Sequence, residues 1–194
     1  MKQLLLALLL SCVAGCYAQT DCFGQKIFDP AVYMMKGYDT IMKHSDIYTQ
    51  SFVGCSMPMW EAVDREGRGI APYDYQGRIL LLNFWWPGCK PCIREFNSLN
   101  KLAKEYEGRV MFLSFVPGSQ IRMDTVLAAH PLDYRIIPNA DSLTTNVFRM
   151  SIFPTNMIIG RDGRVAAIMH GGQTDDGLSN YEKLKPMLER VLLR

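Results

Sequence analysis

The sequence predicts an α/β fold in which helices cover a mixed central sheet. Residues 79–84 form an apolar run typical of a strand buried on both faces. The segment after it has apolar residues at helical spacing. This alternation continues along the chain and ends in two strands joined by a turn. The predicted order, β-α-β-α-β-α-β-β-α, fits one sheet with helices on both faces.

Two segments precede the central strand. Residues 57–73 alternate short apolar runs with the turn signals Glu66-Gly67 and Arg68-Gly69, which predicts a β-hairpin. Residues 21–50 contain a helix start at Asp29-Pro30. They predict one amphipathic helix packed on the domain, with apolar residues at Val32, Met35, Tyr38, Ile41 and Met42.

The elements after the central strand are predicted from the same patterns of apolar residues. The helix after it has an apolar stripe and ends near Gly108. Residues 110–116 predict a second buried strand, 120–129 a helix, and 134–137 a short edge strand. The stripe of the first helix consists of Phe96, Leu99, Ala103 and Tyr106.

Three elements complete the chain. Residues 141–150 predict a helix capped by Asp141 or Ser142. Residues 155–159 and 165–169 flank Gly160-Arg161-Asp162-Gly163, a hairpin signature. Pro186 must start or kink the last helix, whose apolar face carries Leu184, Leu188, Val191 and Leu192.

Composition limits the possible functions. The 194 residues suffice for one domain and a modest extension. Hydrophobic residues make up 48% and charged residues 21% of the chain, a normal globular balance. The 21 Lys and Arg barely exceed the 19 Asp and Glu and are scattered. No nucleic-acid partner is therefore expected, since such binding needs a clustered basic face.

The first eighteen residues predict an export signal, followed by an extension over 19–50 and a domain over 51–194. Lys2 gives a charged start and residues 4–10 an apolar core too short to span a bilayer stably. Two cleavage sites remain open. Val13-Ala14-Gly15-Cys16 is typical of a lipobox, which would leave Cys16 lipidated and anchor the chain; a cut after Ala18 would leave it soluble. Both predict the bacterial cell envelope, in the periplasm.

Either cleavage leaves four cysteines for disulfide chemistry in an oxidising compartment. Cys89 and Cys92 form one pair. Cys22 and Cys55 would form the other, which would join the extension to the start of the domain. The alternative is that these two are unpaired residues of the core.

Cys89 and Cys92 lie where the buried strand turns into a helix. Unpaired N–H groups and the helix dipole favour a thiolate there, and the attacking thiol of such pairs titrates at roughly 3.5–7.5. Cys89 is therefore predicted to be the nucleophile. Cys92 shares the apolar stripe and is predicted to be the sheltered, resolving partner.

Several motifs together resemble the thioredoxin superfamily, and within it the exported TlpA/ResA-like thiol–disulfide oxidoreductases. They are Asn83-Phe84-Trp85, the cysteine pair, Glu95-Phe96 and Phe153-Pro154-Thr155. The resemblance runs from Cys55 to the C-terminus. It implies a thioredoxin-like fold with an N-terminal β-hairpin and no cofactor. It also implies disulfide-containing client proteins, a membrane-embedded thiol electron donor, and a reductant, for example in cytochrome c maturation.

Glu95 is the third candidate catalytic residue. Helical counting places it three residues beyond Cys92 on the apolar side, where desolvation raises a carboxyl pKa and allows it to accept the Cys92 proton. The resemblance implies the same role. The alternative is a surface glutamate paired with Arg94 or Lys101. Asn83 stands where thioredoxins carry a buried aspartate, and an amide cannot replace that proton acceptor.

The client-binding residues follow from the resemblance. It implies that Pro154 is cis and packs against the reactive disulfide, and that Phe153 borders the client groove. Trp86 and Pro91 are further candidates for this surface. Gly88 departs from the family, which usually has an aromatic residue before the first cysteine. Trp85 is predicted to lie in the core.

Two other functions are alternatives to disulfide exchange. A thiol peroxidase usually has threonine or serine three residues before the attacking cysteine, and here that residue is Trp86. A copper-delivering module would use Cys89, Cys92 and His170. No metal site is otherwise expected, because zinc needs a second close pair of ligands and the three histidines are isolated in the sequence.

Overall fold

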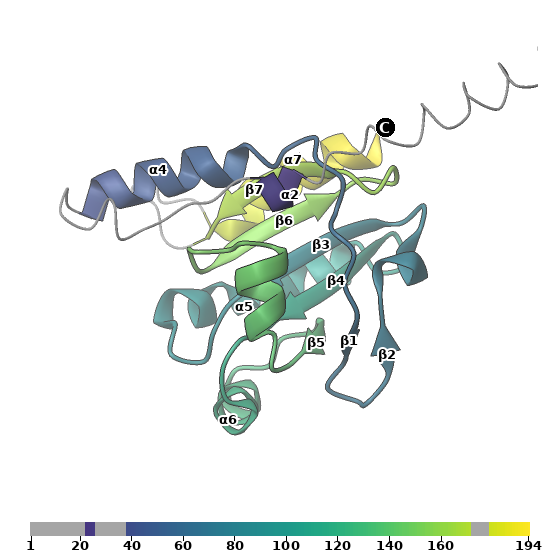
Figure 1. Ribbon diagram of the computed structural model, residues 1–194. Helices are drawn as coiled ribbons and strands as arrows, with labels where there is room; N and C mark the ends of the chain where they lie inside the picture. Colours follow the sequence, from purple (N-terminus) through teal and green to yellow (C-terminus); the bar gives the residue numbers. More distant parts are fainter. Residues whose placement is uncertain (1–21, 26–37, 172–178) are drawn as a thin grey trace, which may run out of the picture.

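The computed structural model describes residues 22–25, 38–171 and 179–194 (Figure 1). Its centre is a five-stranded sheet in the order β5-β4-β3-β6-β7. The strands are β3 (Ile79–Phe84), β4 (Val110–Phe115), β5 (Arg135–Ile137), β6 (Thr155–Ile159) and β7 (Val165–His170). Strand β4 runs parallel to β3, and β5 runs parallel to β4. Strand β6 is antiparallel to β3, and β7 is antiparallel to β6. The prediction of a mixed sheet is confirmed.

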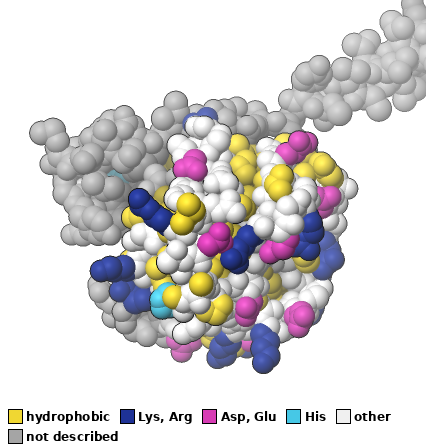
Figure 2. All heavy atoms as spheres, turned by 90° about the horizontal axis from the view of Figure 1, so that it is seen from below, with side chains coloured by type: hydrophobic (Ala, Val, Ile, Leu, Met, Phe, Trp, Pro, Cys, Tyr) yellow, Lys and Arg dark blue, Asp and Glu magenta, His cyan; other side chains and the backbone are white. Residues whose placement is uncertain are grey.

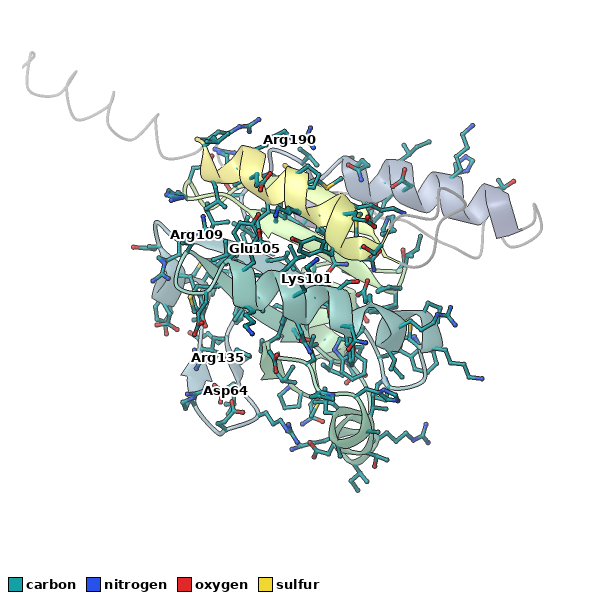
Figure 3. The ribbon with its side chains drawn as sticks, turned by 180° about the vertical axis from the view of Figure 1, so that it is seen from behind. Asp64, Lys101, Glu105, Arg109, Arg135 and Arg190 are labelled. Atoms are coloured by element: carbon teal, nitrogen blue, oxygen red, sulfur yellow. A yellow bond between two sulfur atoms is a disulfide. The ribbon has the colours of Figure 1, made fainter. Side chains whose placement is uncertain are left out.

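Helices α5 (Lys90–Glu105) and α7 (Asn180–Leu192) lie side by side on one face of the sheet (Figure 3), and α6 (Gln120–Ala129) also packs into this layer. The opposite face is covered by the hairpin and by short helical segments (Figure 1). Every residue of β3 is therefore buried. This explains why its sequence, apart from Asn83, is apolar without alternation.

The predicted hairpin is confirmed as β1 (Ala62–Val63) and β2 (Gly69–Ile70). Asp64 ties it to the edge strand β5, because its carboxylate accepts from Arg135 Nε at 2.6 Å and from Arg68 Nε at 2.8 Å (Figure 3). Burial by itself raises the pKa of Asp64, but hydrogen bonds and the two arginines lower it to about 2. The hairpin is thus held to the sheet by a buried carboxylate.

The N-terminal extension contributes α2 (Cys22–Gln25) and α4 (Tyr38–Gln50), and α4 runs beside β7. The expected helix start at Asp29-Pro30, the export signal over 1–18 and Cys16 lie outside the described residues. None of the helices within the described ranges has the length and apolarity needed to cross a membrane.

The prediction for residues 141–150 is partly wrong. Helical structure stops at the π-helical turn η2 (Leu143–Val147), and Arg149 beyond it has φ +52°. Neither proposed side chain caps it. The Asp141 carboxylate instead accepts from the Gly118 N–H at 3.1 Å, and Ser142 accepts from a side chain one turn on.

Of the two alternatives for Pro186, the structure excludes the one in which it starts the last helix. It begins at Asn180, where Ser179 and Glu182 form a capping box, and it continues through Pro186. The predicted apolar face is present, with Leu184 and Leu188 fully buried. The proline is accommodated within the helix and does not start it.

Candidate active site

Helix α5 begins at the cysteine pair. Cys89 is its N-cap, and Cys89 Sγ accepts from the Cys92 N–H at 3.2 Å. The two cysteines form a disulfide. Cys92 is fully buried, whereas Cys89 is 5% exposed. The backbone therefore directs a hydrogen-bond donor at the Cys89 sulfur, as predicted for a residue at the N-terminus of a helix.

The residues before Cys89 explain the glycine at position 88. A Cβ at Gly88 would overlap the six-membered ring of Trp86, so this ring lies over the glycine. Trp86 is 46% exposed, whereas Trp85 is buried and donates from Nε1 to Ser114 Oγ at 2.8 Å. The predicted position of Trp85 in the core is confirmed. The aromatic surface near Cys89 comes from Trp86, two residues earlier than in the resembled family.

The strand register brings Phe153-Pro154 to the same place. Thr155 pairs with Phe84 at the end of β3, so Pro154 lies beside the strand end that leads into the cysteines. The Phe153-Pro154 peptide bond is cis, as expected from the resemblance. Phe153 packs against the core cluster that contains both cysteines.

Glu95 is buried one helical turn beyond Cys92. It is 4% exposed, so the alternative of a surface glutamate paired with Arg94 or Lys101 is wrong. Its partners are three asparagine side chains from three elements. Nδ2 of Asn83 donates to Oε1 at 2.9 Å, Nδ2 of Asn156 donates to Oε2 at 3.4 Å, and Nδ2 of Asn180 also donates to Oε2.

The sheet register explains two of these contacts. Asn83 on β3 and Asn156 on β6 are direct cross-strand neighbours, and Asn83 Nδ2 also donates to Asn156 Oδ1 at 3.0 Å. Both amide hydrogens of Asn83 are used, while its buried Oδ1 has no partner among the described residues. An unpaired buried carbonyl costs about 1–3 kcal/mol. Asn83 therefore donates to Glu95 and Asn156 although its own Oδ1 is left without a hydrogen bond among the described residues.

Burial raises the pKa of Glu95 to about 8, and the three amide hydrogen bonds oppose part of this rise. A carboxyl group with this pKa exchanges its proton near neutral pH. Gly171 lies directly against it: a Cβ there would overlap Glu95 Oε2 and would lie 2.7 Å from Pro154 Cγ. The carboxylate and the cis-proline thus approach each other across a residue without a side chain.

Two further predictions concern the other cysteines and His170. Cys22 and Cys55 form a disulfide, which joins α2 to the segment before the hairpin. His170 is hydrogen-bonded through both ring nitrogens, to Thr49 Oγ1 at 2.7 Å and to Thr155 Oγ1 at 2.8 Å. Neither nitrogen is directed at the cysteines as the copper-module alternative requires.

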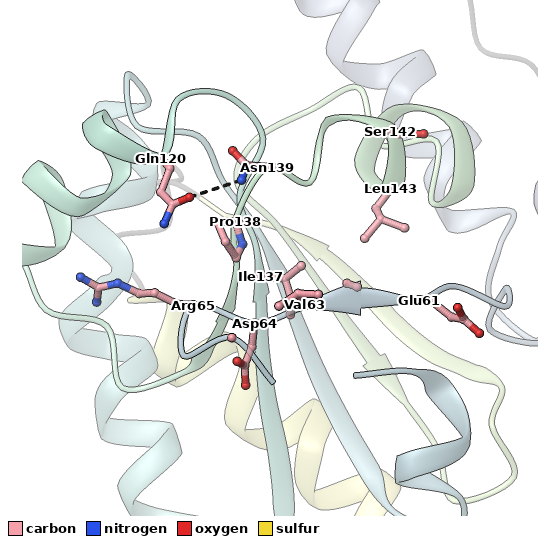
Figure 4. Close-up of a pocket in the computed structure, with 12 residues that line it drawn as sticks. Glu61, Val63, Asp64, Arg65, Gln120, Ile137, Pro138, Asn139, Ser142 and Leu143 are labelled. Carbon is pink, nitrogen blue, oxygen red and sulfur yellow. Dashed lines mark hydrogen bonds between the residues drawn. The ribbon is translucent and has the colours of Figure 1, made fainter. Parts of the chain in front are cut away.

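A separate hollow lies at the end of β5, between the hairpin and the loop at Pro138-Asn139 (Figure 4). Gln120 and Asn139 meet there across 3.4 Å. It contains neither cysteine. On the face shown in Figure 2, basic and acidic side chains are interspersed with apolar and neutral ones, so this face offers no continuous charged band to a ligand.

The fold and the cysteine pair at the start of α5 define a thiol–disulfide oxidoreductase of the thioredoxin superfamily. A family model matches residues 53–168, and the chain belongs to this family, the AhpC/TSA family.

Curated relatives agree with this class. Thiol-disulfide oxidoreductase ResA of Geobacillus thermodenitrificans is 29% identical over 137 residues, covering 69% of this chain and 79% of that protein. ResA of Geobacillus kaustophilus is 27% identical over 150 residues, covering 72% and 86%. ResA of Bacillus subtilis is 24% identical over 133 residues, covering 68% and 74%.

Solved structures show the same fold. A protein of Chlorobium tepidum, provisionally assigned as a thiol:disulfide interchange protein DsbE, superposes with a TM-score of 0.64 at 20% identity and covers 72% of this chain and 97% of its own. StoA of Bacillus subtilis gives a TM-score of 0.56 at 18% identity and covers 68% and 97%.

Sequence reasoning missed Asn156 and Asn180. Asn156 had a visible signal, because it is a polar residue inside the apolar strand 155–159. Asn180 follows Ser179, whose spacing to Glu182 is the signature of a helix start. That signature places Asn180 in a first turn, but only the packing of α7 beside α5 brings it to Glu95.

Proposed function

We propose that this oxidoreductase is exported to the bacterial cell envelope and reduces disulfides of client proteins there, with Cys89 as nucleophile, Cys92 as resolving thiol and Glu95 as proton acceptor. The observation that carries the proposal is a disulfide at the N-cap of α5 with a buried carboxylate one turn further along the same helix.

The first step is attack by Cys89. After reduction of the protein, its thiolate is stabilised by the Cys92 N–H and by the positive end of the α5 dipole. The thiolate attacks a client disulfide, a Cys89–client bond forms, and the second client sulfur leaves as a thiolate. Because Cys89 is only 5% exposed, it can attack only a client that docks closely.

The second step is resolution by Cys92. Its S–H bond breaks, the proton moves to Glu95, and the Cys92 thiolate attacks the Cys89 sulfur. The internal disulfide reforms and the client leaves with both sulfurs reduced. Two electrons have passed to the client, and a membrane-embedded thiol donor returns them. Glu95 suits the transfer because its pKa of about 8 is close to that of a free thiol.

Clients are proposed to bind in extended form across Phe153 and Pro154, with Trp86 and Pro91 on the other side of Cys89. The half-exposed ring of Trp86 supports a role in this contact. Apocytochromes c are one candidate client class, which the resemblance to the exported TlpA/ResA-like oxidoreductases implies.

Export is supported by the N-terminal sequence and by two disulfides in one chain. Attachment to the membrane would come through a lipid on Cys16, if cleavage occurs at the lipobox. Growth with labelled palmitate followed by fractionation tests this, since label lost in Cys16→Ser identifies a lipoprotein.

Cysteine substitutions test the enzyme mechanism. Cys89→Ser should abolish reduction of insulin, and Cys92→Ser should accumulate mixed disulfides. The matched control is the double variant Cys22→Ser/Cys55→Ser, which should retain the exchange activity. Full turnover in both single variants would reject the assignment of these two thiols.

The reduction potential of the Cys89/Cys92 couple tests the direction. A value near about −270 mV supports a reductant, and one near about −120 mV indicates an oxidant. Peroxide consumption that depends on Cys89 would instead favour the thiol-peroxidase alternative.

A further inference from the structure

Asn180 reaches Glu95 because of how α7 starts. The helix begins at this residue, and the capping box formed by Ser179 and Glu182 holds its first turn. The packing of α7 beside α5 carries the side chain to the carboxylate, where Nδ2 donates to Oε2. Asn180 is 6% exposed.

The two oxygens of Glu95 have different surroundings. Oε2 accepts from two amides, those of Asn180 and Asn156, and lies against Gly171. Within the described ranges, the donor to Oε1 is the Asn83 amide. A proton on Oε2 would displace two donors, so Oε1 is the better site for an incoming proton.

No described Lys, Arg or His forms an ion pair with Glu95, and within the same residues its charge is stabilised by the three amide hydrogen bonds. Among the residues that the structure describes, the other titratable groups near it are Cys92 on the same helix and Tyr134 before β5. Burial and the Glu95 charge raise the pKa of Tyr134 well above its ordinary value, so Tyr134 stays neutral. Burial is the main cause of the raised Glu95 pKa, and the three amides are the groups that oppose it.

We propose that Asn180 is a positioning residue for the exchange reaction: it holds Oε2 of the ionised Glu95 and thereby presents Oε1 to the Cys92 proton. This inference rests on the proposed function. In the step itself the Cys92 S–H bond breaks and an O–H bond forms at Oε1. Asn180 takes no proton and touches no reacting sulfur.

The Asn180 hydrogen bond lowers the pKa of Glu95 and so offsets part of the rise that burial causes. Removal of this amide should therefore raise the pKa of Glu95. For each unit by which this pKa rises, the ionised fraction near pH 7 falls about tenfold. A rise of about one unit in Asn180→Ala should therefore slow resolution of a Cys89–client mixed disulfide about tenfold at pH 7. The rate should return to the wild-type value at a pH where Glu95 is ionised in both proteins.

The test has two readouts. Carbon-13 NMR of labelled glutamate gives the Glu95 pKa directly, in wild type, Asn180→Ala and Asn180→Leu, the last of which keeps the volume without the amide. Stopped-flow mixing with a model disulfide gives the resolution rate from pH 6 to 10. The control is Asn100→Ala, on the same helix as Glu95, where the asparagine bonds Pro131 and Asp133 instead.

A raised Glu95 pKa and a matching shift of the rate profile in either Asn180 variant, absent from Asn100→Ala, supports the proposal. An unchanged Glu95 pKa in the folded variants overturns it, even where exchange activity is normal. A wild-type protein that exchanges no disulfides instead overturns the proposed function, and with it the kinetic half of this inference, while the NMR readout still tests the Asn180–Glu95 contact.

Discussion

Glu95→Gln should change how the stability of the oxidised protein depends on pH. The folded protein holds the Glu95 proton up to a pKa of about 8, whereas the unfolded chain releases it at the ordinary value of 4.5. Protonated Glu95 thus contributes stability that is complete below pH 4.5 and is lost as the pH rises to about 8. Glutamine remains neutral throughout and should show no such loss.

The rise of this pKa from 4.5 to about 8 corresponds to about 5 kcal/mol, at about 1.36 kcal/mol for each pKa unit. Domains of this size are stable by about 5–15 kcal/mol in total, so the loss should be large. Urea unfolding of the oxidised protein from pH 5 to 9, followed by tryptophan fluorescence, measures it. The difference between variant and wild type should increasingly favour the variant as the pH rises.

The control is Glu105→Gln, which makes the same substitution on the same helix. Hydrogen bonds from Lys185 and Tyr181 lower the pKa of the exposed Glu105, so its contribution changes below the tested range. His170 has its pKa lowered by burial, but it titrates in every variant and cancels in the difference. Stability curves of Glu95→Gln and wild type that run parallel from pH 5 to 9 would refute the reasoning.

Three further predictions concern packing and charge. Gly171→Ala should lower the free energy of unfolding by about 1–3 kcal/mol and slow disulfide exchange, because its Cβ would overlap Glu95 and Pro154. The control Gly69→Ala has nothing within 4 Å of the new Cβ and should change neither property. Urea titration measures the stability and insulin reduction the exchange. Gly88→Ala should destabilise the wild type more than it destabilises Trp86→Ala, with a coupling of about 0.5–3 kcal/mol in a double-mutant cycle, since the clash is with the Trp86 ring. Asp64→Asn should lower the melting temperature at pH 6, and the gap to wild type should narrow as the pH falls from 4 towards 2, because the pKa of Asp64 is lowered from 3.8 to about 2.

The sheet could be predicted because its signals are local. The apolar run 79–84, the stripe after Cys92 and the hairpin turn at 160–163 each depend on neighbours in sequence. The prediction of a capped helix over 141–150 was partly wrong because the partner of Asp141 is not local. Asp141 has the chemistry of a cap, but the folded chain offers it the Gly118 N–H from another loop, and that contact cannot be read from the segment itself.

The candidate site divides in the same way. The position of Cys89 at the N-cap and the burial of Glu95 follow from helical counting along one segment. The identity of the partners of Glu95 does not, because Asn156 and Asn180 come from β6 and α7, 61 and 85 residues away. Only a known register and a known helix packing would have assigned them.

This distribution of partners bears on why an asparagine at position 83 is compatible with proton transfer. An amide there cannot take a proton, but it can donate to a carboxylate on α5 and to Asn156 at once. In the proposed mechanism the acid therefore lies on the helix, and the strand supplies a hydrogen-bond donor to it. Because Asn180 completes the set from the first turn of α7, the proton affinity of Glu95 depends on how that turn is held against α5. A displacement of α7 should therefore change the thiol chemistry without touching either cysteine.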